Sequence, residues 1–153
     1  MRAGKAVAVH DQAECVREVF RRHGLRCTRQ REVLYDALAA SRSHPTAEEL
    51  FDSVRNEDES LSLATVYNTL EAFTQAGLCR RIPSTNGNGP CRFDAEVHQH
   101  VHLALPDGRV LDVPEELGEK LMRCSTIGEI ARRMGLDLSK VSVQLVVRER
   151  PEA

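Results

Sequence analysis

Tryptophan is absent from the 153-residue sequence, and only 4% of its residues are aromatic. The 41% of residues that are hydrophobic still allow a modest core in one ordinary domain or in each of two small ones. No stretch approaches the roughly eighteen consecutive apolar residues that span a bilayer, and the segment Met1 to Lys5 lacks the apolar run of a secretory signal. We therefore expect a cytoplasmic protein with no membrane partner.

Cysteine pairs with C-x-x-C spacing, which commonly supply half of a zinc site, are also missing. The five cysteines are widely separated, and we expect them to be reduced and mostly buried. They are Cys15, Cys27, Cys79, Cys91 and Cys124.

The chain as a whole has no excess of positive charge, since its formal net charge is −2. This argues weakly against nucleic-acid binding, because domains that bind phosphates usually carry surplus lysine and arginine. The distribution is more informative, because residues 17–31 hold six arginines against one acid, Glu18, for a local charge of +5. A solvated helix face is the alternative explanation of this basic segment. Its arginines are Arg17, Arg21, Arg22, Arg26, Arg29 and Arg31.

Three helices are predicted in the first third of the chain, from apolar residues at helical spacing and from capping residues. The first begins at about residue 11 and stops at Gly24, and the second is capped by Thr28 and ends near Ser41. Thr46 and Glu49 have the spacing of a capping box, in which each side chain bonds the other residue's free backbone amide, and they begin the third helix.

A fourth helix is capped by Ser62 and ended by Gly77, and apolar residues recur on one of its faces. The opposite flank carries small polar residues and one aromatic, which suit a surface that lies in the DNA major groove and touches base edges. The residues of this flank are Thr65, Tyr67, Asn68, Thr69 and Ala72. Beyond Gly77, residues 78–83 and 91–95 read as two short strands around a turn-rich loop, and helices followed by such a hairpin are typical of a winged helix.

Histidines at positions 98, 100 and 102 alternate with other residues, so in an extended strand their imidazoles project from one face. A surface strand with incidental histidines is the alternative reading. Pro106 to Gly108 predicts a tight turn into a second strand. If Leu105 and Arg109 close that turn, the ladder sets His102 opposite Asp112, with Cβ atoms roughly 5 Å apart. Two imidazoles and a carboxylate that converge in this way form a site suited to zinc, iron or manganese.

Two other residues are candidates for the same site on weaker grounds. Asp94 has the same even parity as His100 and can swing in from a hinge. His44 lies in the loop before the third helix, and chain order alone gives no reason for it to lie near the sheet.

Several segments resemble the ferric uptake regulator (Fur) family, most specifically Ser-Leu-Ala-Thr-Val-Tyr-Asn-Thr-Leu at residues 62–70. The resemblance covers about residues 15–115 in the family's order. The other matching segments are residues 24–31, 44–50, 92–94, 100–102 and 108–112.

The resemblance implies a transcriptional regulator, a repressor, that binds double-stranded A/T-rich palindromic operators as a homodimer when its regulatory metal is bound. The helix that matches residues 62–76 then enters the major groove. There Tyr67 contacts a thymine methyl, and Thr65 and Asn68 reach bases or phosphates. Arg26 matches a basic position that enters the minor groove, and Arg29 of the same segment is a further DNA-binding candidate.

The resemblance also implies one regulatory divalent metal per subunit, Fe²⁺, Zn²⁺ or Mn²⁺. Glu96 and His98 are further candidate ligands, whereas Gln99 and Val101 occupy the positions of the family's additional metal site. Carried over residue by residue, the ligands are His44, Asp94, His100, His102 and Asp112.

The chain departs from the family in lacking the two C-x-x-C pairs that hold a structural zinc, so we expect no structural Cys₄ zinc. Dimerisation must then depend on strand pairing and apolar contact, for which the alternating residues 141–147 are the candidate strand. Two short helices are expected between Pro114 and Gly135, the second opened by Thr126 with Glu129. The predicted fold class is α+β, with a winged-helix DNA-binding domain at residues 1–93, a hinge at 94–97 and a small α/β dimerisation and metal-sensing domain at 98–153.

The signal that is sensed stays open between several alternatives. Asp112 together with Asp94 resembles the peroxide-sensing branch of the family, in which bound iron oxidises its own histidine ligands, and loss of the zinc cysteines also occurs in the haem-responsive branch. A metallo-hydrolase would need a general base beside an open coordination position, and no H-E-x-x-H motif supplies one. A winged-helix interaction module that binds no metal would leave the histidine pattern unexplained. We therefore predict that the chain is not an enzyme.

Overall fold

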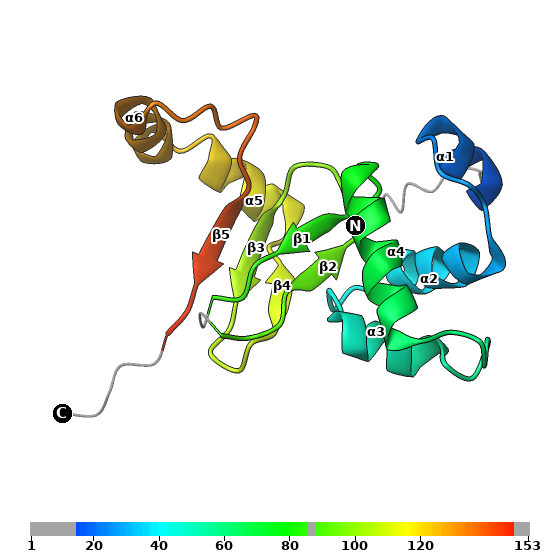
Figure 1. Ribbon diagram of the computed structural model, residues 1–153. Coiled ribbons are helices and arrows are strands. Elements are labelled where there is room, and N and C mark those ends of the chain that lie inside the picture. Colours follow the sequence, from blue (N-terminus) through cyan, green and yellow to red (C-terminus); the bar gives the residue numbers. More distant parts are fainter. Residues whose placement is uncertain (1–14, 86–87, 149–153) are drawn as a thin grey trace, which may run out of the picture.

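The computed structural model describes residues 15–85 and 88–148, so the predicted start of the first helix at residue 11 lies outside the described residues. Helices α1–α4 gather on one side, the three-stranded sheet with α5 and α6 lies on the other, and the β1–β2 hairpin lies between them (Figure 1). The helices are α1 (Val16–Arg22), α2 (Arg29–Ala40), α3 (Ala47–Val54), α4 (Leu63–Gln75), α5 (Glu115–Met122) and α6 (Ser125–Met134), and the strands are β1 (Arg80–Ile82), β2 (Arg92–Asp94), β3 (Val101–Ala104), β4 (Val110–Asp112) and β5 (Val143–Val146).

The helix ends in the first half are set by the predicted capping residues. Thr28 caps α2, Ser62 caps α4, and Thr46 with Glu49 forms a complete capping box at α3. Each such cap stabilises its helix by about 1 kcal/mol. Gly77 follows the C-terminus of α4 with a left-handed φ of 75°, which a residue with a side chain adopts only at a cost.

The four helices enclose one hydrophobic core, which we call the head core, and the part of the chain that contains it is called the head. Phe20, Leu34, Leu70 and Phe73 are fully buried, and burial of each such side chain contributes roughly 1.5–3 kcal/mol. The rings of Phe20 and Phe73 lie 5.6 Å apart. Packing on this core holds the inner face of α4 and leaves its outer face to solvent.

The β1–β2 hairpin is antiparallel and is hydrogen-bonded back to the head. The backbone amide of Phe93 donates to the carbonyl of Pro45 at 3.0 Å, and Thr46 forms a β-bridge with Arg92. These bonds fix the loop before α3 against the end of β2. As a result His44, which precedes Pro45, lies close to Asp94 at the end of that strand.

The second sheet has the strand order β4-β3-β5, with β3 and β4 antiparallel and β3 and β5 parallel. The amide of Leu105 donates to the carbonyl of Arg109 at 2.9 Å, and His102 pairs with Asp112, as the turn predicted. We call the part of the chain formed by this sheet, α5 and α6 the sensor unit. Ile82 of β1 packs with Ala104 and Val110 in a small cluster that joins the head's hairpin to the sensor unit.

The fold class is α+β as predicted, but several local expectations are wrong. Strand β3 begins at Val101, so His98 lies before the strand and does not share its face. Helix α6 begins at Ser125 after Cys124, and Glu129 pairs with arginines one turn later instead of closing a capping box with Thr126. The thiols are free but not mostly buried, because Cys15 and Cys124 lie at exposed helix starts and only Cys79 of the five is buried.

None of the helices in the described part of the chain has both the length and the apolarity needed to cross a membrane.

Candidate metal centre

Five side chains from four separate segments meet where the head, the hairpin and the second sheet come together. His44 comes from the loop before α3, and Asp94 ends β2. His100 and His102 come from the approach to β3 and from β3 itself, and Asp112 ends β4. The structure thus gathers all five residues that the resemblance implied as metal ligands, although they span 68 positions of the sequence between His44 and Asp112.

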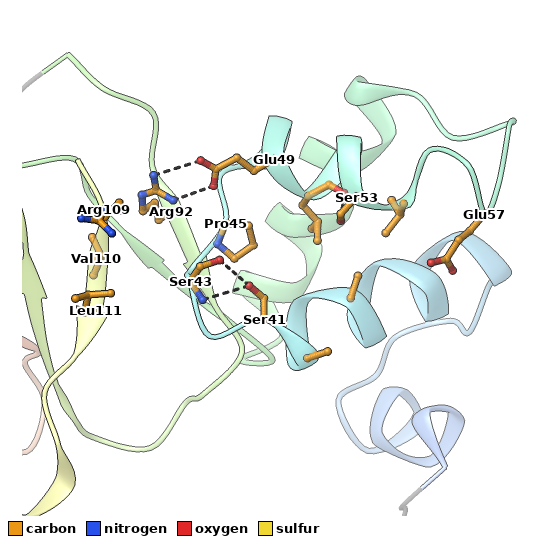
Figure 2. A pocket seen from close by; sticks show the side chains of 14 residues that line it. Ser41, Ser43, Pro45, Glu49, Ser53, Glu57, Arg92, Arg109, Val110 and Leu111 are labelled. Carbon is orange, nitrogen blue, oxygen red and sulfur yellow. Dashed lines mark hydrogen bonds and ion pairs between the residues drawn. The ribbon is translucent and has the colours of Figure 1, made fainter. Parts of the chain in front are cut away.

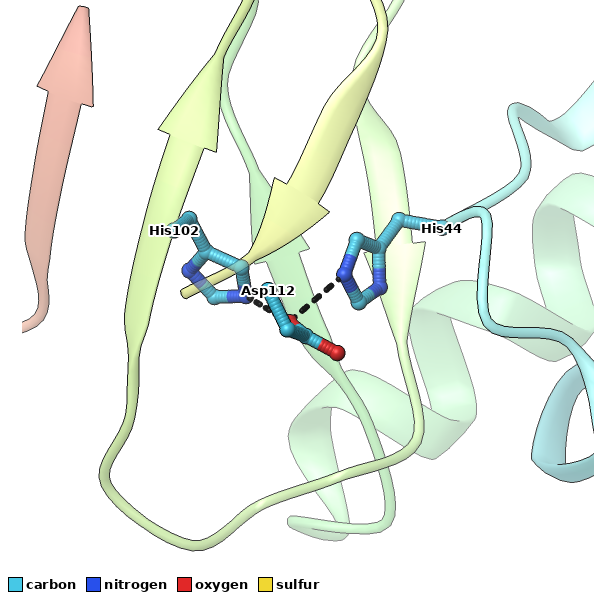
Figure 3. Close-up of side chains that lie close together, drawn as sticks. All are labelled: His44, His102 and Asp112. Carbon is cyan, nitrogen blue, oxygen red and sulfur yellow. Dashed lines mark hydrogen bonds and ion pairs between the residues drawn. The ribbon is translucent and has the colours of Figure 1, made fainter. Parts of the chain in front are cut away.

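His44 reaches this cluster from the head in an unusual backbone conformation. Its φ of 48° is left-handed, which costs a residue with a side chain on the order of 1 kcal/mol. The side chain is 2% exposed, and its Nε2 lies 2.9 Å from Asp112 Oδ1. Figure 3 shows His44 pointing from its loop toward Asp112, with His102 approaching from β3. The loop before α3 therefore brings His44 of the head to the sheet of the sensor unit.

The other two imidazoles approach the same carboxylates. His100 Nε2 lies 3.1 Å from Asp94 Oδ2 and 3.2 Å from Asp112 Oδ1. His102 Nε2 lies 3.3 Å from Asp94 Oδ2 and 3.6 Å from Asp112 Oδ1. Ligand atoms of His44, His102 and Asp112 lie within 4.8 Å of one another, as do those of Asp94, His100 and His102. Both groups share His102, so they belong to one centre.

Two buried imidazole nitrogens at this centre lack well-formed hydrogen bonds, and a cation could bind them. His44 Nδ1 and His100 Nε2 are buried, and neither has a hydrogen bond of good geometry among the described residues, although each lies within 4.0 Å of a carboxylate oxygen. Buried polar atoms without a well-formed hydrogen bond are rare in folded proteins, and a bound ion is one way to satisfy them. Imidazole nitrogens and carboxylate oxygens are ligands of zinc, iron and manganese. The donor set therefore fits a divalent transition-metal ion.

The pKa values of both carboxyl groups and of His100 are strongly shifted. Burial alone would raise the pKa of Asp94 and of Asp112, but hydrogen bonds from the histidines outweigh it and lower the pKa of both carboxyls below the usual range. Asp112 and then Asp94 raise the pKa of His100 to about 10. In the metal-free protein a proton on His100 therefore sits where positive charge is required, between two ionised carboxylates.

The sequence comparisons identify the family. The model of the ferric uptake regulator family matches residues 22–146, which is most of the chain. The chain belongs to the ferric uptake regulator family. The peroxide-responsive repressor PerR of Staphylococcus saprophyticus is 34% identical over 94 residues, which are 61% of this chain and 62% of that protein. The match thus spans less than two thirds of that relative's length.

Solved structures of the family support the same fold. The Vibrio cholerae ferric uptake regulator superposes with a TM-score of 0.69 at 27% identity, covering 88% of this chain and 99% of that one. The Pseudomonas aeruginosa ferric uptake regulator with manganese gives a TM-score of 0.65 at 29% identity, covering 88% and 97% of the two chains. The α+β architecture described above is therefore that of the Fur family.

Glu96 and His98, the further candidate ligands of this Fur-family chain, are not brought to the centre. The side chain of His98 is 92% exposed and lies 4.0 Å from the Glu96 carboxylate. The backbone amide of Glu96 donates to Asp94 Oδ1 at 2.8 Å, so this residue contributes its main chain to the arrangement. The alternation of residues 98, 100 and 102 suggested that His98 shares a face with the other histidines, but this holds only if the strand includes residue 98, and it begins at Val101.

The predicted DNA-binding residues are at least partly accessible on the head. Arg26, Arg29 and Asn68 are exposed, and Tyr67 is 44% exposed on α4. Thr65 is partly exposed and bonds the Ser62 hydroxyl at 2.8 Å. Thr69, also expected on this flank, is buried instead.

Two residues that sequence reasoning did not single out touch these sites. Glu48 accepts a hydrogen bond from the Tyr67 hydroxyl at 2.5 Å, which raises the pKa of Tyr67. Arg92 lies two positions before Asp94 and donates to the backbone carbonyl of His44 at 3.0 Å. No spacing rule links either residue to its partner, since the contacts join segments that are distant in sequence.

Proposed function

We propose that this Fur-family protein is a metal-dependent transcriptional repressor that binds A/T-rich palindromic DNA as a homodimer. One divalent metal per subunit would be held by His44, Asp94, His100, His102 and Asp112. The observation that carries the proposal is the place of His44 in the head, 2.9 Å from Asp112 of the sensor unit. A ligand set that draws on both parts of the chain links the geometry of the DNA-binding head to metal occupancy.

The ion would supply the positive charge that holds three imidazoles and two carboxylates together. The residues of the chain do the rest. His44 would hold the loop before α3 against the sheet of the sensor unit, and Asp94 would hold the end of the β1–β2 hairpin there. Without a common partner these side chains would hold the head to the sensor unit less firmly, and ordering the head on DNA would then cost more free energy. Differential affinity of the metal for the ordered arrangement is what allostery requires.

The outer surface of α4 supports DNA as the partner. Tyr67 and Asn68 project from a helix whose inner face is fixed by the head core. Arg26 lies before α2 and Arg29 begins it, and both are exposed, so they can contact phosphates or enter a minor groove. Phosphate contacts position a protein on DNA and base contacts specify the sequence, so the surface offers both kinds of group.

The homodimer is supported by apolar surface on the sensor unit. Strand β5 lies at the edge of the second sheet and contains Val146, which is 44% exposed. Ile130 and Met134 of α6 are 52% and 68% exposed. An exposed sheet edge and exposed apolar side chains are both features that proteins usually cover by pairing. We also maintain the expectation that no Cys₄ zinc assists this pairing.

A peroxide-responsive repressor is the second candidate, because the relatives that are 32–34% identical carry that name. The carboxylates of Asp94 and Asp112 at the centre are compatible with iron as the ion. The discriminating measurement is mass spectrometry of peptides after the Fe²⁺-loaded protein meets hydrogen peroxide. Addition of oxygen to His44, His100 or His102 would favour this candidate, and unmodified peptides would exclude it.

The proposed function is tested with a DNA duplex that the Mn²⁺-loaded protein selects from a random pool. We define the metal-dependent gain as the Kd for this duplex in chelator divided by its Kd with Mn²⁺. The wild-type gain should be at least about tenfold, within the usual range of allosteric coupling. Replacing His100 and His102 together by alanine should reduce the gain to one while the circular dichroism spectrum is retained. A wild-type gain of one with Mn²⁺, Zn²⁺ and Fe²⁺ would refute the proposal.

A further inference from the structure

A cleft of about 550 Å³ separates the head from the β3–β4 hairpin, and Arg92 lies within it. Figure 2 shows Arg92 facing Glu49 of α3, with Arg109 and Val110 of the hairpin on the other side. The cleft marks a place where head and sensor unit approach each other without close packing. Contacts that cross it are therefore placed to affect the angle between the two parts.

The guanidinium of Arg92 bonds to both sides of this cleft. Its Nε donates to the carbonyl of Gly108, in the β3–β4 turn, at 2.9 Å. Its Nη1 donates to the carbonyl of His44 at 3.0 Å and to Glu49 Oε2 at 2.9 Å, and Nη2 donates to Glu49 Oε1 at 3.3 Å. One side chain thus joins the sensor hairpin, a candidate metal ligand and helix α3.

We infer that Arg92 is a positioning residue that transmits metal occupancy to the DNA-binding helices. The inference rests on the proposed function and adds the residue through which the coupling passes. Arg92 holds the main chain of His44 in the left-handed conformation that lets its imidazole reach Asp112. Through Glu49, Arg92 also holds the N-terminus of α3. Helix α3 in turn packs against α4.

The chemistry of the contact requires arginine. The Arg92 side chain is only 15% exposed, so its charge needs the Glu49 carboxylate, and its planar fork presents donors along separate edges to three acceptors at once. A lysine ammonium could pair with Glu49 but cannot span Gly108 and Glu49 in the same way. The Glu49 carboxylate also accepts a hydrogen bond from the backbone amide of Thr46 in the capping box. The Arg92–Glu49 ion pair is therefore connected to the start of α3.

The test compares the metal-dependent gain of Arg92→Met with that of Arg109→Met. Arg109 is a matched control, because it lines the same cleft but pairs with Asp107 of its own turn and is 65% exposed. Arg92→Met should lower the gain by about tenfold, whereas the Mn²⁺ affinity of the free protein should fall no more than about threefold because every ligand side chain is retained. Arg109→Met should leave both values at wild type.

Two milder variants keep the test decisive if Arg92→Met fails to fold. Arg92→Lys keeps the charge, and Glu49→Gln keeps the capping acceptor but removes the carboxylate, so each should give a gain between those of wild type and Arg92→Met. A wild-type gain in the folded Arg92 variants would overturn the inference, as would a loss of gain matched by an equal loss of Mn²⁺ affinity. A wild-type protein without any gain would instead overturn the proposed function, which separates the two failures.

Discussion

His44→Asn tests most directly whether the head and the sensor unit are joined through the metal centre. Asparagine tolerates the left-handed backbone of position 44, where φ is 48°, better than most residues with a side chain. The substitution removes the ring nitrogen that lies 2.9 Å from Asp112 Oδ1 and leaves the other four candidate ligands in place. It therefore removes the ligand supplied by the helical part of the head, and the metal can still bind to the remaining residues.

The expected magnitude follows from the contacts that are lost. In the metal-free protein His44→Asn removes one partly buried hydrogen bond, which should lower the free energy of unfolding by about 1 kcal/mol. In the metal-loaded protein the coupling between metal and DNA should disappear, which corresponds to a loss of about 1–3 kcal/mol of binding free energy, or roughly 5- to 150-fold in Kd. The effect on DNA binding should thus appear only when metal is present.

Fluorescence anisotropy of the selected duplex, with Mn²⁺ and with chelator, measures both states. His98→Asn makes the same chemical change at a side chain that is 92% exposed, and it should keep the wild-type metal-dependent gain. A wild-type gain in His44→Asn, with Mn²⁺ bound, would show that the head is not controlled through this residue. Loss of DNA binding in chelator as well as in Mn²⁺ would equally contradict the reasoning, because the variant would then damage the head itself.

Two further predictions concern DNA readout and protons. Tyr67→Ala should weaken binding to the selected duplex by about 1–3 kcal/mol and binding to unrelated DNA much less, and equal losses on all sequences would remove Tyr67 from base readout. Mn²⁺ binding at pH 7.5 should release the proton carried by His100, because the pKa of His100 is raised to about 10 in the metal-free protein and the metal requires the neutral imidazole. Metal affinity should therefore rise as the pH increases toward 10, and calorimetry in buffers of different ionisation enthalpy would contradict this if no proton were released.

Local patterns in the sequence were reliable where neighbouring residues decide the structure. The caps at Thr28, Thr46 and Ser62 depend on backbone amides within one helical turn. The pairing of His102 with Asp112 depends on a short turn that fixes the register of the strands on both sides. Parity failed at His98 because the alternation of a strand holds only where the chain is extended, and the strand begins at Val101.

By itself the sequence determined the helices of the head, the register of the β3–β4 hairpin and therefore one histidine–aspartate pair of the candidate centre. Only the tertiary structure decided that His44 joins them, since its approach depends on hydrogen bonds between the loop before α3 and strand β2. The same is true of Arg92, whose guanidinium contacts residues 43 positions before it and 16 positions after it. Contacts over such separations arise from the packing of whole elements, and no local periodicity encodes them.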